Sequence, residues 1–255
     1  MSKNRRGNVP QSTVSGLILY GRHAVFAALA NPERNIGKIL TTRENFDELK
    51  AHCQKHNIDP AKIQIVDRSD INKLLPADAV HQGYALYCAP LPGYAIEEIC
   101  ALADRQDNCT VLVLDQVTDP QNIGAIIRSC AAFGALALIL QDKNSPAETA
   151  AMAKASAGTI DILPICRVTN LSRAIDQLKT AGFWTIGMDG YAKDTIDKIN
   201  KAGKNAIIMG SEGKGMRRLV EESCDITVRL PIDPRVESLN VSTAAAIALY
   251  EMKRS

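Results

Sequence analysis

The sequence is poor in aromatic residues and contains no apolar run long enough to cross a membrane. Aromatics make up 4% of the 255 residues, with a single Trp, so Ala, Ile and Leu must fill most of the core. A membrane-spanning helix needs about 18 or more largely apolar residues in succession, and no stretch here reaches that length. No apolar stretch follows the basic N-terminal residues, as a secretory signal would require. We therefore expect a cytoplasmic protein with no membrane partner and with one large core or two modest ones.

Paired cysteines and clustered metal ligands are also missing. The seven cysteines are scattered, odd in number and without a CxxC pair, which argues against a disulfide framework and for a reducing compartment. His52 and His56 lie four residues apart, but no third ligand lies near them, so we interpret them as part of a surface helix. The sequence thus predicts no metal site. Its net charge of +2 does not by itself imply a nucleic-acid partner.

Strand-like and helix-like segments alternate along the chain and predict an α/β fold. Residues 1–16 read as a flexible basic tail, either solvated or in weak contact with phosphates. Residues 17–90 predict a small α/β domain, and residues 91–108 a linker with a connecting helix. Beyond residue 109 the strand segments are unbroken apolar runs, which is typical of a parallel sheet covered on both faces. The pattern alone is Rossmann-like. Its strands are expected at 110–117, 135–142, 160–168, 183–189, 205–210 and 225–232.

The segment DPQNIGAIIR opens a predicted helix over 119–134. Asp119 suits the N-cap and Pro120 the first helical position. Arg128 lies off the apolar stripe of this helix and beside small residues, so it can reach a ligand at the strand ends. A solvated arginine on the outer face is the alternative, and spacing alone favours it.

The segment MGSEGKGMRR carries glycines in neither the Walker A nor the GxGxxG spacing. Lys214, Arg217 and Arg218 crowd the positive N-terminal end of a helix predicted over 216–224, and two glutamates follow at its negative end. Pairs four residues apart, such as Arg217 with Glu221, recover only a few tenths of a kcal/mol. An anionic partner would compensate this unfavourable arrangement, and a solvated helix face is the alternative.

The segment SLNVSTAAAIALYE offers three capping residues before a helix predicted over 240–254. Ser238, Asn240 and Ser242 alternate with other residues, although one cap is enough to start a helix. Either some of these side chains have a second task, or all of them serve the helix start.

Taken together and in this order, the three segments resemble the SpoU (TrmH-like) family of RNA 2′-O-ribose methyltransferases, within the SPOUT class. The resemblance covers about residues 109–254. The N-terminal part, with GRHAV at 21–25 and HQG at 81–83, is similar to the small α/β RNA-binding domain of members that methylate guanosine in 23S ribosomal RNA. The resemblance implies a SPOUT domain over 109–255 with a parallel sheet and a deep C-terminal trefoil knot. It also implies S-adenosylmethionine as cofactor, bound in a bent shape, and a homodimer formed through the knotted domain.

Transferred position by position, the resemblance assigns roles to residues of all three segments. Catalytic roles are expected for Asn122, Arg128, Glu212, Ser238 and Asn240. Cofactor contacts are expected from Gly210, Glu212, Leu230, Ile232 and Leu239. RNA contacts are expected from Arg22, Arg128, Lys214 and Arg217. Residues 233–237 depart from the small residues common there in the family, so the rim of the cofactor site differs from its relatives.

Methylation of a ribose hydroxyl needs a base or strong stabilisation of the developing alkoxide. Family mechanisms propose the arginine at position 128 as the base, but a neutral arginine at pH 7 costs roughly 7 kcal/mol. Our hypothesis is that Arg128 binds an RNA phosphate and polarises the hydroxyl. The alternatives are methylation of transfer RNA or of another ribosomal site, and a non-catalytic RNA-binding assembly factor. A Rossmann dehydrogenase is disfavoured because GxGxxG is missing.

Overall fold

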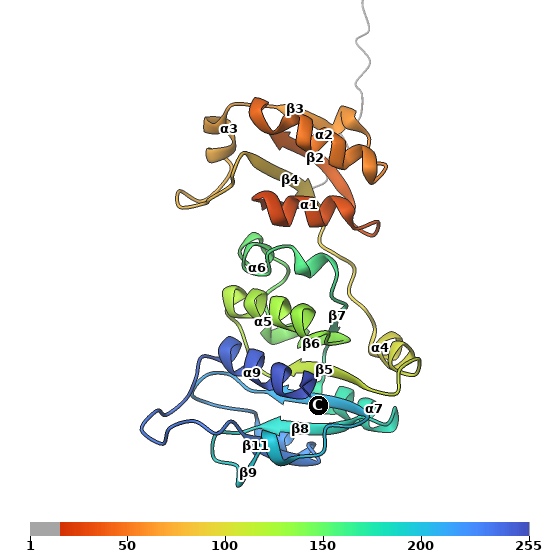
Figure 1. Cartoon of the computed structure of the whole chain (residues 1–255), viewed down its shortest axis with the longest axis vertical. Coiled ribbons are helices and arrows are strands. Elements are labelled where there is room, and N and C mark those ends of the chain that lie inside the picture. Colours follow the sequence, from red (N-terminus) through yellow and green to blue (C-terminus); the bar gives the residue numbers. More distant parts are fainter. Residues whose placement is uncertain (1–15, 255) are drawn as a thin grey trace, which may run out of the picture.

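The computed structural model describes residues 16–254. All of the predicted basic tail except residue 16 lies outside these residues. Two α/β units follow each other along the long axis of the molecule (Figure 1). We call them the N-terminal lobe, residues 17–90, and the C-terminal lobe, residues 95–254.

The N-terminal lobe is built on a four-stranded sheet in the order β1-β4-β2-β3. Strand β4 is antiparallel to both β1 and β2, whereas β2 and β3 are parallel. The strands are β1 (Leu17–Tyr20), β2 (Ile36–Thr41), β3 (Ile63–Ile65) and β4 (Tyr84–Cys88). The helices are α1 (Arg22–Ala30), α2 (Phe46–Lys55) and α3 (Arg68–Asn72).

The C-terminal lobe contains a seven-stranded sheet in the order β7-β6-β5-β10-β8-β11-β9. Every pairing in it is parallel, which confirms the predicted parallel sheet. Its strands are β5 (Cys109–Leu114), β6 (Ala137–Gln141), β7 (Ile165–Val168), β8 (Trp184–Met188), β9 (Asp194–Thr195), β10 (Lys204–Met209) and β11 (Ile226–Arg229).

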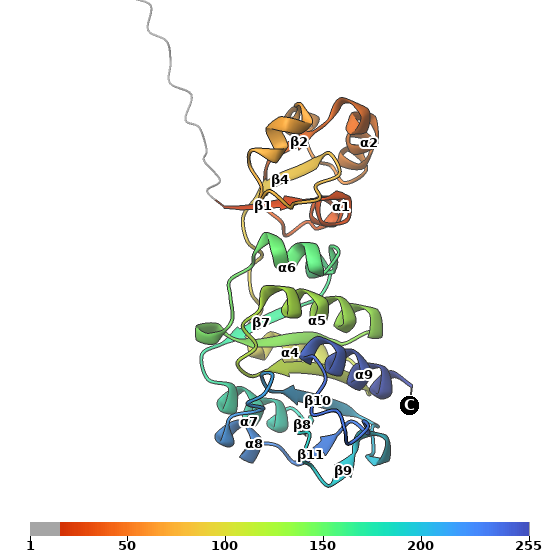
Figure 2. The ribbon, with the colours of Figure 1, turned by 90° about the vertical axis from the view of Figure 1, so that its left-hand side faces the viewer.

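Helices cover both faces of this sheet (Figure 2). They are α4 (Ile96–Ala103), α5 (Pro120–Phe133), α6 (Ala150–Ala155), α7 (Leu171–Thr180), α8 (Arg218–Glu222) and α9 (Val241–Lys253). Side chains alternate across a strand, and β5 shows the result. Leu112 and Leu114 pack into one core with residues of α5, α6 and α9. Val111 and Val113 pack into a second core with residues of α4, α7 and α8. The apolar run of β5 is unbroken because both of its faces are buried.

Two predicted elements have other bounds in the structure, and one strand was not predicted. The strand expected over 160–168 starts only at Ile165, because Thr159–Asp161 form a 3-10 turn and Pro164 precedes the strand. The two-residue strand β9 had no sequence signal. The helix expected over 216–224 is limited to Arg218–Glu222, because Arg217 has an extended backbone.

A buried ion cluster joins the two lobes. Arg34, which follows α1, donates to Asp161 at 2.9 Å and to Glu148 at 2.8 Å, and its side chain is fully buried. Asn31 also donates to Asp161, at 3.2 Å. On another part of the joint, Lys154 of α6 donates to the carbonyl oxygen of Val80 at 2.8 Å. No helix within residues 16–254 is both long and apolar enough to cross a membrane.

Candidate active site

The three sequence motifs meet at one edge of the large sheet. Each follows the carboxyl end of a strand: residues 115–119 follow β5, residues 210–217 follow β10, and residues 230–240 follow β11. Because these strands are parallel, their carboxyl ends lie on the same edge, where open α/β sheets bind their ligands. The path of the chain therefore gathers segments about 100 residues apart into one place.

A hydrogen-bond network links one residue from each motif. Glu212 Oε1 accepts from Asn240 Nδ2 at 2.6 Å and from the Val241 backbone N–H at 2.9 Å. Asn240 Nδ2 donates its second hydrogen to Asn122 Oδ1 at 3.1 Å. Glu212 thereby satisfies one of the open N–H groups at the start of α9. The structure thus brings together Asn122, Glu212 and Asn240, three of the predicted catalytic residues.

The start of α9 shows which of the three capping candidates forms the cap. Asn240 is the N-cap, and its Oδ1 accepts from the Ser242 backbone N–H at 2.9 Å and from the Ser242 hydroxyl at 2.6 Å. Ser238 is exposed and has no hydrogen bond within the described residues, so its hydroxyl is available to a ligand.

The glycine loop, residues 210–215, is closed by hydrogen bonds between its own backbone groups. Ser211 and Gly215 exchange backbone hydrogen bonds of 3.1 and 3.0 Å, and Gly213 and Gly215 have positive φ angles of 75° and 65°. A Cβ atom on Gly210 would lie 2.0 Å from the backbone carbon of Gly215. Gly210 is therefore required for the turn itself, and the loop presents Glu212 outward.

Arg217, which is partly exposed, is held by the buried Asp115. Its backbone N–H donates to Asp115 Oδ2 at 2.8 Å, and its Nε donates to Asp115 Oδ1 at 2.8 Å. Its Nη2 lies 2.7 Å from the same Oδ1 and donates to Gln141 Oε1 at 2.9 Å. The Asp115 side chain is fully buried at the end of β5, whereas that of Arg217 is 38% exposed. This pair holds the end of the glycine loop against β5 and β6.

Sequence reasoning missed Asp115, although a signal was present. It is a lone carboxylate that ends the apolar run VLVL, and a buried charge requires a partner. Nothing in the sequence pointed to Arg217 as that partner. The predicted pair of Arg217 with Glu221 is not formed, whereas Arg218 pairs with Glu222 at 2.7 Å.

The other predicted RNA-contacting residues differ in their surroundings. The side chains of Arg128 and Lys214 are exposed and make no hydrogen bond or ion pair within residues 16–254. Arg22 lies in the N-terminal lobe, where it pairs with Glu48 at 2.5 Å and stacks over Phe26 at 4.7 Å. The structure does not bring Arg22 to the carboxyl edge of the large sheet.

The segment after β11 carries the remaining predicted cofactor contacts. Leu230 is partly buried against the core, and its carbonyl oxygen accepts from the Ile232 N–H at 3.0 Å. Leu239 is partly buried next to Asn240. The divergent residues 233–237 form a local turn in which Arg235 pairs with Asp233 at 2.7 Å. Residues 16–254 contain no group of three or more His, Cys, Asp or Glu side chains that could hold a metal ion.

The fold and the candidate site define a class: an α/β protein with polar motif residues gathered at the carboxyl edge of a parallel sheet. Residues 109–250 match the model of the SpoU rRNA Methylase family, and residues 18–94 match the model "RNA 2′-O ribose methyltransferase substrate binding". The chain belongs to the SpoU rRNA methylase family, which confirms the resemblance seen in the sequence.

Individual relatives cover nearly the whole chain. The 23S rRNA (guanosine-2′-O-)-methyltransferase RlmB of Coxiella burnetii is 35% identical over 92% of this chain and 94% of its own length. A Staphylococcus saprophyticus protein named for the TrmH family of tRNA/rRNA methyltransferases is 36% identical over 93% of this chain and 95% of its own. The crystal structure of the SpoU methyltransferase AviRb from Streptomyces viridochromogenes, in complex with the cofactor AdoMet, superposes with a TM-score of 0.77. It is 22% identical and covers 97% of this chain and 93% of that one, so it shows a shared fold.

Proposed function

We propose that this protein transfers a methyl group from S-adenosylmethionine to the ribose 2′-hydroxyl of a guanosine in 23S ribosomal RNA. The observation that carries the proposal is the meeting of Asn122, Glu212 and Asn240 at the carboxyl edge of the sheet in a member of the SpoU family. The 23S rRNA guanosine activity named for the Coxiella burnetii relative supports the substrate. The reaction takes place in the cytoplasm, where ribosomal RNA is assembled.

The residues present fit S-adenosylmethionine. This cofactor carries a sulfonium, an ammonium and a carboxylate, which leave it one net positive charge, and it has no phosphate, so a negative group suits its site and no phosphate cradle is required. The Glu212 carboxylate faces outward from the glycine loop, and the nearby cation Arg217 is neutralised by Asp115. Gly210, Leu230, Ile232 and Leu239 would hold the adenosyl part through backbone groups and apolar contact. When bound, the cofactor supplies an electrophilic methyl carbon.

The side chains of this protein place and polarise the ribose. The exposed Arg128 side chain has no ionic partner within residues 16–254, so it would hold an RNA phosphate and stabilise the alkoxide that develops at the 2′-oxygen. Asn240 donates hydrogen bonds to both Asn122 and Glu212, so the amides of Asn122 and Asn240 have defined orientations. Ser238 would close the pocket with its hydroxyl. Positioning supplies much of the rate, because a methyl transfer proceeds in line.

The N-terminal lobe would bind RNA outside the methylated nucleotide, and two copies of the chain would pack through the C-terminal lobe. An exposed apolar face supports the dimer, since Tyr250 of α9 is 52% exposed and Ile247 is 41% exposed. The ring centroids of Tyr250 and Phe133 of α5 lie 5.9 Å apart. Light scattering on the purified protein measures this state directly. The trefoil knot of the segment after β11 stays a prediction from the family.

Methylation of defined RNAs tests the function. The purified protein is incubated with labelled S-adenosylmethionine and either 23S rRNA fragments or transfer RNA, and the 2′-O-methyl is mapped by primer extension. We expect one guanosine of 23S rRNA to be modified. Modification of transfer RNA alone would overturn the substrate, and a protein that S-adenosylmethionine does not stabilise in thermal unfolding would overturn the enzyme assignment.

A further inference from the structure

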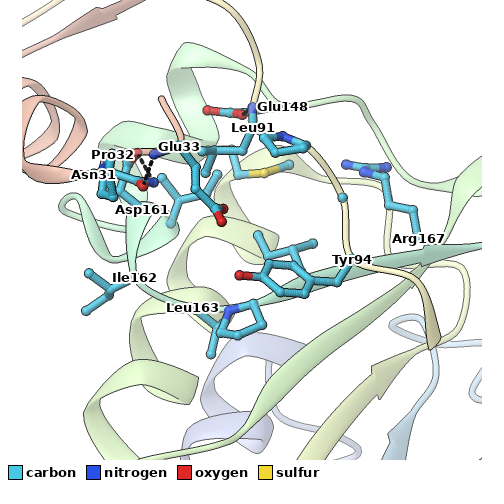
Figure 3. Close-up of a pocket in the computed structure, with 16 residues that line it drawn as sticks. Asn31, Pro32, Glu33, Leu91, Tyr94, Glu148, Asp161, Ile162, Leu163 and Arg167 are labelled. Carbon is cyan, nitrogen blue, oxygen red and sulfur yellow. Dashed lines mark hydrogen bonds between the residues drawn. The ribbon is translucent and has the colours of Figure 1, made fainter. Parts of the chain in front are cut away.

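A cavity of about 220 Å³ lies at the joint between the two lobes (Figure 3). Its walls come from the end of α1, from the linker that includes Leu91 and Tyr94, and from the segment between α6 and β7. Pro164 and Ile165 place it at the amino end of β7, whereas the candidate active site lies at the carboxyl ends of the parallel strands. The cavity is therefore separate from that site.

The cavity combines a carboxylate, an aromatic ring and aliphatic walls. The Glu33 carboxylate and the Tyr94 hydroxyl both point into it (Figure 3). Within residues 16–254, neither of these groups has a hydrogen-bond or ionic partner. Met152, Ile160 and Leu163 supply apolar surface. Such a lining suits a small molecule with an alkyl part and one charged end.

A buried carboxylate gives the same wall further negative charge. Asp161 lines the cavity, and its side chain is fully buried. Its Oδ1 accepts from Arg34 and Asn31, but its Oδ2 is a buried oxygen without a hydrogen-bond partner. The buried Arg34 Nη2 of the same ion cluster also has no partner, so this cluster acts on an occupant of the cavity through its charges and not through a direct contact.

The balance of charges favours a cation over an anion. Glu33, Glu148 and Asp161 line the cavity as carboxylates, against Arg167 on the lining and Arg34 behind it. Three negative groups against two positive ones leave one net negative charge. Arg167 is held by the carbonyl oxygen of Pro146 at 2.6 Å, on the side of the cavity away from Glu33 (Figure 3).

We propose that this cavity is a binding site for a primary aliphatic ammonium ion. The ammonium would lie between the Glu33 carboxylate and the Tyr94 hydroxyl, with its alkyl chain against Met152 and Leu163. The carboxylate would accept a charge-assisted hydrogen bond from the ammonium, and the tyrosine hydroxyl oxygen would accept a second one. The volume is below the roughly 300–1,000 Å³ of sites for drug-sized ligands, so the ligand is a short amine or diamine.

The occupant would tie the two lobes together. Glu33 belongs to the N-terminal lobe, Tyr94 to the linker, and Met152 and Leu163 to the C-terminal lobe. A ligand that binds only when these walls are in place stabilises that arrangement by mass action. The site thus goes beyond the methyl-transfer function and can be measured without cofactor or RNA.

Binding is tested by calorimetry and thermal unfolding of the full chain with n-butylamine, 1,4-diaminobutane, n-butanol and butyrate at equal ionic strength. We expect the two amines to bind and to raise the melting temperature, and the neutral alcohol and the anion to have no such effect. Tighter binding of the diamine would identify the diamine as the ligand class. Equal responses to n-butylamine and n-butanol would overturn the proposal.

Two variants locate the site. Glu33→Gln keeps the shape of an exposed, unpaired side chain, so the protein should fold normally and bind n-butylamine at least about tenfold more weakly. Tyr94→Leu removes the hydroxyl acceptor and should weaken binding about two- to fivefold. Glu221→Gln on α8 is the matched control, with an exposed glutamate outside the cavity, and should bind as the wild type does. Wild-type affinity in Glu33→Gln would refute the proposed site.

Discussion

The ion pair of Asp115 and Arg217 is expected to anchor the glycine loop, and substitution of Asp115 tests this expectation. Asp115→Ala removes a fully buried carboxylate that accepts two hydrogen bonds from Arg217 at 2.8 Å and lies 2.7 Å from a third nitrogen. Removing one partner of a buried ion pair costs about 3–5 kcal/mol. The Arg217 side chain is 38% exposed, so water partly replaces the lost partner. We therefore expect a loss of about 2–3 kcal/mol.

Urea and thermal unfolding measure this loss. For a chain of this size, about 2–3 kcal/mol corresponds to a melting temperature lower by roughly 4–12 °C. Arg218→Ala is the matched control, since its partner pair with Glu222 is 78% and 55% exposed and should contribute at most about 0.5 kcal/mol. Equal losses in Asp115→Ala and Arg218→Ala would refute the reasoning.

The same variant should also weaken the cofactor site. The loop that carries Glu212 is anchored at its far end by Arg217, so its release should lower the affinity for S-adenosylmethionine. The double variant Asp115→Ala/Arg217→Ala isolates the coupling between the two residues. Its loss of stability should be smaller than the sum of the two single losses, because the single variants each leave an unpaired group.

Four further outcomes follow from the structure. Arg128→Lys should lower kcat at least about tenfold with unchanged cofactor affinity, because lysine lacks the bidentate geometry; activity near that of the wild type would contradict this role. Glu212→Gln keeps an acceptor for Asn240 and Val241 and should preserve the melting temperature that Glu212→Ala lowers, while both weaken cofactor binding in a titration. Arg34→Met leaves Glu148 and Asp161 buried without their cation and should cost about 3–5 kcal/mol in urea unfolding. Burial lowers the pKa of His81, with help from Arg68 and Lys154. The unfolded chain therefore protonates His81 at a higher pH than the folded protein does, so the free energy of unfolding should decrease as the pH falls below about 6.5. His81→Asn should reduce that decrease in unfolding curves recorded between pH 7.5 and 5.5.

The sequence predicts the elements of the C-terminal lobe well, because each of its main strands is an unbroken apolar run. That the motifs meet at one edge follows from the parallel pairing of the strands that precede them. The order of the strands is not predicted, because β10 lies between β5 and β8 and no local pattern encodes that placement. The two-residue strand β9 is too short to show any periodicity.

The sequence names Asn122, Glu212 and Asn240 as candidate residues, but it does not predict the contacts between them. Glu212 and Asn240 were both identified, but their hydrogen bond joins positions 28 residues apart, and spacing in sequence does not report such distances. The same holds for Arg217, whose partner Asp115 lies 102 residues away. Long-range pairs of this kind are fixed by the strand order, which is the part of the fold that the sequence pattern leaves open.

The basic residues predicted at the start of helix 216–224 have different partners in the structure. Arg217 lies before α8 and is neutralised by Asp115, and Arg218 pairs with Glu222 within the helix. These two arginines therefore need no anionic ligand. Of the four cations expected to contact RNA, Arg22 is paired with Glu48, whereas Arg128 and Lys214 have no protein partner within residues 16–254. Phosphate binding beside the reacting ribose should thus depend on Arg128 and Lys214. Arg128 belongs to the motif of Asn122 and Lys214 to the motif of Glu212, and Asn240 is hydrogen-bonded to both of these residues.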